Sequence, residues 1–154
     1  MSEEQEQPIV APIRVLIVDN DKDLARTMTE SLDRIGFQCT CATSGVEGAE
    51  KIESHNFDVI VTDLMMNDVD GMAILKKAKE TQEECEVIMV TGHASVPRAV
   101  EAMREGAYNF LEKPITPKRL QVAASKAAES VQLKYQNLQL RSRLDERFGF
   151  ENLI

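Results

Sequence analysis

The chain has 154 residues, 43% of them hydrophobic and 29% charged, which is the composition of one soluble globular domain with an appendage. No apolar run approaches the roughly 20 residues that span a bilayer, and the acidic N-terminus lacks the apolar segment of a signal peptide, so we expect no contact with a membrane. The net charge of −8 argues against a nucleic-acid-binding module, and three sparse cysteines predict reduced thiols in the cytoplasm rather than a disulfide framework.

The charge divides the chain into two unequal parts. Residues 1–112 carry 10 basic and 22 acidic residues, whereas residues 113–154 carry 8 basic and 4 acidic residues, so a net charge of −12 is followed by one of +4. The second part also has no proline after Pro117. We therefore expect a disordered tail over residues 1–8, a globular domain over 9–128 and a helical linker over 129–154.

Strand and helix patterns alternate five times along the domain. In chain order, the sequence predicts strand 13–18, a helix from Asp21 or Asn20 to Gly36, strand 37–42, a helix from Ser44, strand 57–62, a helix from Asp70–Gly71, strand 87–90, a helix from Val96 to Gly106, strand 108–111 and a last helix from Thr116–Pro117. Apolar residues recur at helical spacing and mark the expected inward faces: Leu24, Met28, Leu32 and Ile35; Val46, Ala49 and Ile52; Met72, Ile74, Leu75 and Ala78; Val96, Val100 and Met103.

This alternation predicts parallel βαβ units in a three-layer α/β sandwich. The continuous apolar runs at 13–18, 58–62 and 87–90 are typical of central strands, because central strands are covered on both faces. Ligands of such sheets bind at the carboxyl ends of the strands, near the point where the strand order reverses. The residues that follow each strand are therefore the first candidates for a functional site.

Polar residues stand at four of these strand ends. The first strand ends in Asp19-Asn20-Asp21, the third in Asp63, the fourth in Thr91 and the fifth in Lys113. Two carboxylates about 4 Å apart repel by roughly 4 kcal/mol at an effective dielectric constant of 20, so the cluster favours a bound cation. Oxygen ligands without His or Cys favour Mg²⁺ or Mn²⁺. A carboxylate beside a metal, a lysine and a hydroxyl is equipped to attack phosphorus.

Four motifs carry a resemblance to a known family. VLIVDND, FDVIVTDLMMNDVDG, VIMVTGHAS and AYNFLEKPI occur in this order over about residues 12–128. Together they resemble the receiver domain of bacterial two-component response regulators. The resemblance implies a doubly wound (βα)5 sheet with strand order 2-1-3-4-5, as in flavodoxin- and CheY-like proteins.

The resemblance also implies roles for individual residues. Asp63 is the expected phosphoryl acceptor, Thr91 the switch hydroxyl and Phe110 the switch aromatic. Lys113 is the expected phosphate-sensing lysine, joined to Pro114 by a cis peptide bond. The expected metal ligands are Asp19, Asn20, Asp63 and the backbone carbonyl of Met65, and the residues that flank the path of the hydrolytic water are Met65 and His93. Asn20 departs from the Asp or Glu usual in the family, so we expect weaker metal binding. The plainer alternatives are helix caps at 19–20, a strand-end hydroxyl at Thr91 and a core aromatic at Phe110.

The last helix shows two different patterns. Leu120, Ala123, Ala124, Ala127 and Val131 form a stripe that should pack on the domain. Further along, Leu133, Asn137, Leu140 and Leu144 follow coiled-coil spacing, and a single Asn in the seam favours a parallel homodimer over the alternative of a monomeric extension. The final segment RSRLDERFGFENLI resembles the linker before the ATPase domain of NtrC-like activators of sigma-54 RNA polymerase. This implies an output domain outside the chain and no nucleic-acid contact by this portion.

The sequence thus predicts a phosphorylation-controlled receiver. A cognate histidine kinase would donate the phosphoryl group, and the chain would promote only its own phosphorylation and dephosphorylation rather than act as an enzyme. Two alternatives remain. Asp19-x-Asp21 resembles the opening of haloacid-dehalogenase-type phosphatases, although Asp23 stands where that family has a hydroxyl residue. A phosphorylation-independent interaction module, disabled for metal binding by Asn20, is the other.

Overall fold

The computed structural model describes residues 12–92 and 95–152, with side chains as far as Asp145, so the expected tail over residues 1–8 lies outside the described residues. Five parallel strands alternate with five helices in this part of the chain. The strands are β1 Arg14–Val18, β2 Gln38–Ala42, β3 Val59–Asp63, β4 Glu86–Thr91 and β5 Asn109–Glu112. The helices are α1 Lys22–Asp33, α2 Gly45–Ser54, α3 Gly71–Thr81, α4 Val96–Arg104 and α5 Pro117–Asn152.

The strands form one sheet in the order β2-β1-β3-β4-β5, which confirms the predicted topology. β3 and β4 are buried along their whole length, as expected of central strands with continuous apolar runs. Parallel pairing places Val18 beside Thr62 and Asp63 beside Val90. The carboxyl ends of β1, β3 and β4 therefore lie next to one another at one edge of the sheet.

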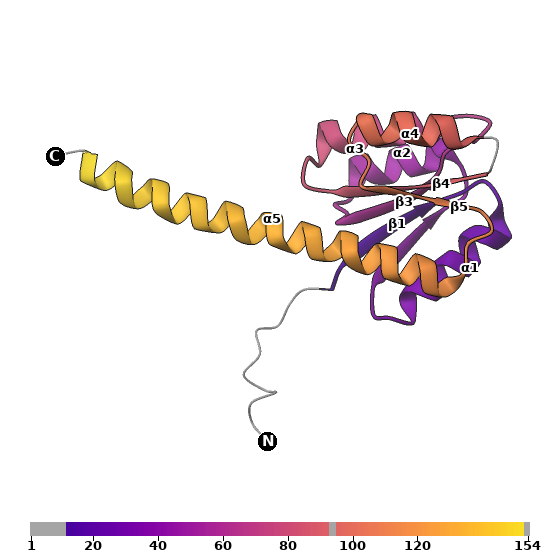
Figure 1. Ribbon diagram of the computed structural model, residues 1–154, viewed down its shortest axis with the longest axis horizontal. Helices are drawn as coiled ribbons and strands as arrows, with labels where there is room; N and C mark the ends of the chain where they lie inside the picture. The colour runs from indigo at the N-terminus through magenta and orange to yellow at the C-terminus, as the bar shows by residue number, and fades with distance from the viewer. Residues whose placement is uncertain (1–11, 93–94, 153–154) are drawn as a thin grey trace, which may run out of the picture.

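The helices cover the sheet in two layers (Figure 1). α1 and α5 lie on one face, where Met28, Leu32 and Leu120 belong to one apolar cluster. α2, α3 and α4 lie on the other face, where Ile52 and Ile74 belong to a second cluster. This arrangement is the predicted three-layer sandwich.

Side-chain caps fix where three of the helices begin. The Asp21 carboxylate accepts hydrogen bonds from the backbone N–H groups of Asp23 and Leu24, so Asp21 rather than Asn20 caps α1. Ser44 and Asp70 cap α2 and α3 in the same way. Three of the helix starts predicted from the sequence are thus confirmed.

Four residues expected to face inward are exposed instead: Ile35, Val46, Val100 and Met103. Ile35 lies beyond the last residue of α1. α2 and α4 approach the sheet through small residues, which are Gly48 in α2 and Ala99 and Ala102 in α4. A Cβ on Gly48 would come within 2.8 Å of the Val18 side chain, so a larger residue at that position would clash with β1. The prediction gave weight to large apolar residues, whereas close helix–sheet packing selected small ones.

α5 is one continuous helix of 36 residues. The stripe predicted to pack on the domain is buried, as expected: Leu120, Ala123, Ala124, Ala127 and Val131. Lys134 still pairs with Glu86 of β4 over 3.1 Å, and past this contact α5 projects from the domain as the long arm in Figure 1. Within the described residues, no helix combines the length and apolar character needed to cross a membrane.

Candidate functional site

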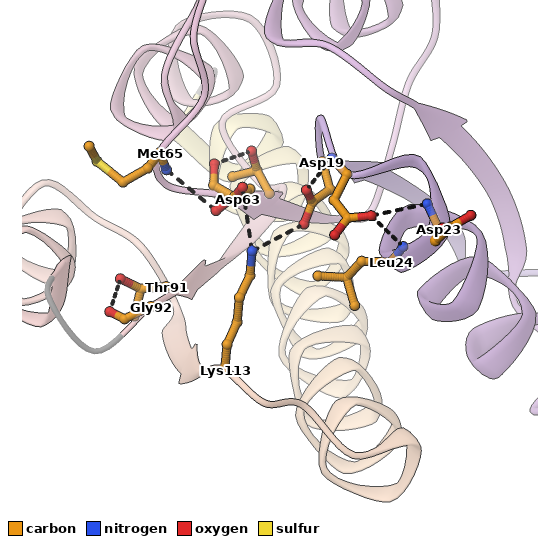
Figure 2. Close-up of polar contacts among 10 residues, drawn as sticks. Asp19, Asp23, Leu24, Asp63, Met65, Thr91, Gly92 and Lys113 are labelled. Carbon is orange, nitrogen blue, oxygen red and sulfur yellow. Dashed lines mark hydrogen bonds and ion pairs between the residues drawn. The ribbon is translucent and has the colours of Figure 1, made fainter.

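Three strand ends bring charged side chains together at the carboxyl edge of the sheet. Lys113 Nζ lies 3.6 Å from Asp63 Oδ2 and 3.7 Å from Asp19 Oδ2. Figure 2 shows the lysine reaching between the two carboxylates. Asp63 is 5% exposed and Asp19 is fully buried, so little solvent screens these charges. The Lys113–Pro114 peptide bond that precedes α5 is cis, as the sequence predicts.

Asp19 carries the unusual electrostatics of the site. Its Oδ1 accepts a hydrogen bond of 2.9 Å from the Asp21 backbone N–H, whereas Oδ2 has no hydrogen-bond partner among the described residues. Burial raises the pKa of Asp19 to about 6, and the charge of Asp63 adds to this increase, whereas the Asp21 N–H and Lys113 oppose it. One lysine therefore balances two carboxylates, and one buried oxygen lacks a donor.

This arrangement fits a small divalent cation. Within the described chain, no group of three or more His, Cys, Asp or Glu residues is placed to hold a metal ion. A site here would instead combine the carboxylates of Asp19 and Asp63 with amide or carbonyl oxygens. Such an all-oxygen set suits Mg²⁺, which usually keeps several waters and takes only one or two carboxylates. The unpartnered oxygen of Asp19 is the feature that a cation would satisfy.

The two expected switch residues lie near this cluster but do not engage it. Thr91 is fully buried, and its hydroxyl donates a 3.1 Å hydrogen bond to the Gly92 carbonyl. In Figure 2 this pair stands apart from the group formed by Asp63 and Lys113. Phe110 is half-buried and packs against the apolar cluster beneath α2, α3 and α4.

The other residues expected at the site are Met65, Asn20 and His93. The Met65 backbone N–H donates to Asp63 Oδ1 over 3.4 Å, and its side chain is half exposed. Asn20 is exposed in the turn before α1. His93 lies outside the described residues.

Sequence reasoning missed two residues at the rim of the site. Arg98, in α4, lies 3.0 Å from Asp70 Oδ2 through Nη2 and 3.5 Å from the Met65 sulfur through Nη1. Asp70 was predicted only as the start of a helix. The pair is 28 residues apart in the chain, so no local pattern indicates the contact.

Comparison with known proteins places this site in a family. Residues 15–125 match the response regulator receiver domain. The C4-dicarboxylate transport transcriptional regulatory protein DctD of Pseudomonas aeruginosa is 35% identical over 144 residues, which cover 91% of this chain and 30% of that protein. Crystalline NtrX from Brucella abortus has a TM-score of 0.81 and 29% identity, covering 87% of this chain and 30% of that one. A receiver domain protein from Clostridium thermocellum has a TM-score of 0.75 and 30% identity, covering 79% and 98%.

The chain belongs to the response regulator receiver domain family of two-component systems, and its relatives are NtrC-like sigma-54 regulators. The resemblance to receiver domains and the expected relationship to NtrC-like sigma-54 activators are thereby confirmed. The chain spans less than a third of the length of the curated relatives named DctD.

Proposed function

We propose that Asp63 accepts a phosphoryl group from the phosphohistidine of a cognate histidine kinase. The contact between Lys113 and the buried Asp63 carboxylate carries this proposal. One Asp63 oxygen attacks phosphorus, so that an O–P bond forms while the P–N bond breaks and the imidazole keeps the electron pair. Lys113 stabilises the charge that gathers on the phosphoryl oxygens, and burial strengthens this interaction.

Receiver domains generally use Mg²⁺ for phosphorylation. We propose the same for this chain, with Mg²⁺ or Mn²⁺ held by the side chains of Asp19, Asn20 and Asp63 and by the backbone carbonyl of Met65. A bound ion would neutralise negative charge on the incoming phosphoryl group. Because Asn20 contributes no charge, the affinity for the ion is expected to be lower than with a third carboxylate.

The proposed response to phosphorylation is a shift between two conformations. The Thr91 hydroxyl leaves the Gly92 carbonyl and donates to a phosphoryl oxygen. Phe110, now half-buried, then repacks, and the surface formed by α4 and β5 changes shape. Such a shift requires that phosphorylation stabilise one conformation more than the other. The new contacts of the phosphoryl group provide this difference in free energy.

The decisive test is direct phosphorylation in the presence of Mg²⁺. Acetyl phosphate should add one phosphoryl group that is stable in acid and labile in base, and peptide mapping should place it on Asp63. Asp63→Asn should abolish the adduct, whereas Asp23→Asn, on the exposed surface of α1, should not.

Two results would contradict the proposal. Turnover of a phosphomonoester that fails with Asp19→Asn but survives Asp63→Asn would indicate a phosphatase of the haloacid-dehalogenase type. Absence of NMR shifts around Asp63 and Thr91 with millimolar Mg²⁺ and beryllofluoride would indicate a phosphorylation-independent interaction module.

We also propose a homodimer formed through the exposed part of α5. Leu133, Leu140 and Leu144 are 59%, 57% and 49% exposed, so a second copy would cover apolar surface that the domain leaves open. In this proposal residues 9–128 are the receiver and 129–154 the linker to an ATPase output domain. The proposed location is the cytoplasm, which the free cysteines Cys39, Cys41 and Cys85 support.

A further inference from the structure

We propose that Arg98 is a positioning residue that holds α4 in its resting place through Asp70. This inference rests on the proposed function, because it concerns the resting side of the same switch. Three observations carry it: the anchoring of Asp70 to the acceptor strand, the light attachment of α4 to the domain, and the two contacts of the Arg98 guanidinium.

Asp70 is rigidly tied to the acceptor. It caps α3 by accepting a 3.0 Å hydrogen bond from the Ala73 N–H. The next residue, Gly71, packs directly on the backbone of β3, and a Cβ there would lie 2.6 Å from the Asp63 carbonyl oxygen. Its N–H also donates to the Leu64 carbonyl over 2.8 Å. The Asp70 carboxylate therefore has a fixed place relative to Asp63.

α4 is attached more lightly than the other helices of its layer. Ala99 and Ala102 are its buried residues, and both are small, so each contributes little apolar area. Ser95 makes no side-chain capping bond at its start. A groove of about 420 Å³ runs along α3, lined by Leu75 and Lys79 among others, and reaches Glu105 just after the end of α4. α4 itself is therefore held to the domain mainly by two small side chains.

The Arg98 guanidinium connects α4 to two residues outside that helix, Asp70 and Met65. One nitrogen pairs with Asp70 at 3.0 Å, and another lies 3.5 Å from the sulfur of Met65. The backbone N–H of Met65 in turn donates to Asp63 Oδ1. Arg98 therefore joins α4 to two residues that are bonded to the acceptor or packed on its strand.

We assign the Arg98–Asp70 contact to the resting arrangement, because it occurs together with a Thr91 hydroxyl that donates to the Gly92 carbonyl rather than contacting Asp63. Any displacement of α4 would separate Arg98 from an Asp70 that cannot follow. The side chains of Arg98 and Asp70 are 42% and 34% exposed, so the pair is partly screened by solvent. Pairs of this exposure bias an equilibrium by about two- to fivefold, enough to tune a switch without locking it.

The test is a double-mutant cycle in the full chain with Arg98→Gln and Asp70→Asn. Asn replaces Asp well as a helix cap, so Asp70→Asn removes the charge and keeps the start of α3. With Mg²⁺ present, each single variant should bind beryllofluoride about two- to fivefold more tightly than the wild type, as followed by NMR at Thr91. The double variant should bind no more tightly than the singles, because all three lose the same contact.

A second readout needs no ligand. Amides of α4 in free Arg98→Gln should exchange with solvent faster than in the wild type, whereas Arg104→Gln, at the end of the same helix, should leave them unchanged. Additive effects in the cycle, or equal α4 exchange in all variants, would overturn the inference. If the wild type fails to bind beryllofluoride, the proposed function fails, and the exchange comparison alone still decides whether Arg98 restrains α4.

Discussion

At the scale of one residue, the position of the Asp19 side chain lowers the stability of the metal-free fold. The side chain is fully buried, and one oxygen lacks a hydrogen-bond donor, although Lys113 lies 3.7 Å away. An ionised carboxylate in such a place destabilises the fold unless a cation is added. This cost is consistent with the proposed role of Asp19 as a metal ligand, because its Oδ2 is left without a hydrogen-bond donor among the described residues.

We expect Asp19→Asn to stabilise the metal-free protein at pH 7.5. The pKa is raised to about 6, so between pH 4 and 6 the folded state binds a proton that the unfolded chain has lost. The folded state therefore loses stability as the pH rises towards about 6, because Asp19 must ionise while it is buried. Above that pH the full destabilisation is present. The variant should gain on the order of 1–3 kcal/mol in urea unfolding with a chelator present. Unchanged stability at pH 7.5, with an unchanged pH profile, would contradict this account.

The cysteines give a second prediction at this scale. Burial raises the pKa of Cys39 and of Cys85 to about 12, and a hydrogen bond to Asp33 adds to the increase for Cys39. Because the thiolate is the reactive form, both thiols should be alkylated at pH 8 at least about 100-fold more slowly in the native protein than in urea. Mass spectrometry of labelled peptides measures this directly. Equal rates in native and unfolded protein would show that the thiols are accessible.

At the scale of the elements, close backbone contacts determine which substitutions the chain tolerates. α2 begins at Gly45, where a Cβ would overlap the carbonyl oxygen of Val69 in the loop between β3 and α3. The same loop holds α2 through Asp68, whose carboxylate accepts hydrogen bonds from the N–H groups of Gly45 and Val46. This loop is thus fixed by α2 as well as by α3.

Gly45→Ala should therefore destabilise the domain by about 2–3 kcal/mol, because backbone atoms cannot yield to the added methyl group. Gly92→Ala is the matched control, since a Cβ there meets no atom of the described residues within 4 Å. Thermal or urea unfolding of both variants tests the prediction. A loss in Gly45→Ala no larger than in Gly92→Ala would mean that the loop moves freely.

The elements also show how far sequence reasoning reaches. Continuous apolar runs marked the central strands, and Asp21, Ser44 and Asp70 marked three helix starts, because these signals are local. Ile52 and Ala49 of α2 face the core as predicted, whereas Val46 and, in α4, Val100 and Met103 do not. These positions were wrong because Gly48 and Ala99 carry no apolar signal that distinguishes close packing from exposure. The cluster of Asp19, Asp63 and Lys113 followed from topology, since parallel strand ends must meet. The Arg98–Asp70 contact joins residues 28 positions apart, one in α4 and one capping α3, which no local pattern indicates.

At the scale of the whole molecule, a compact domain carries a projecting helical arm. The arm departs from the domain after Lys134, which pairs with Glu86, and leucines of this part of α5 are exposed to solvent. Its oligomeric state therefore depends on whether these leucines meet a second copy. The exposed Leu138, on the same stretch but outside the proposed seam, provides an internal comparison.

Leu140→Glu should convert the proposed dimer to monomer, because it buries a charge in the seam of each helix. Leu138→Glu makes the same chemical change outside the seam and should leave the dimer intact. Sedimentation equilibrium across a tenfold range of protein concentration distinguishes the two results. A monomeric wild type, or equal loss of dimer in both variants, would refute the seam.

The unbroken course of α5 has a mechanical consequence. The residues from 135 to 152 extend about 27 Å beyond Lys134, the last residue paired with the domain, at about 1.5 Å per residue. Such a rod acts as a lever, so a tilt of about 5° at its base would carry its tip sideways by roughly 2 Å over that length. A displacement that is small on the scale of a side chain would thus become large enough to realign whatever is joined to the far end.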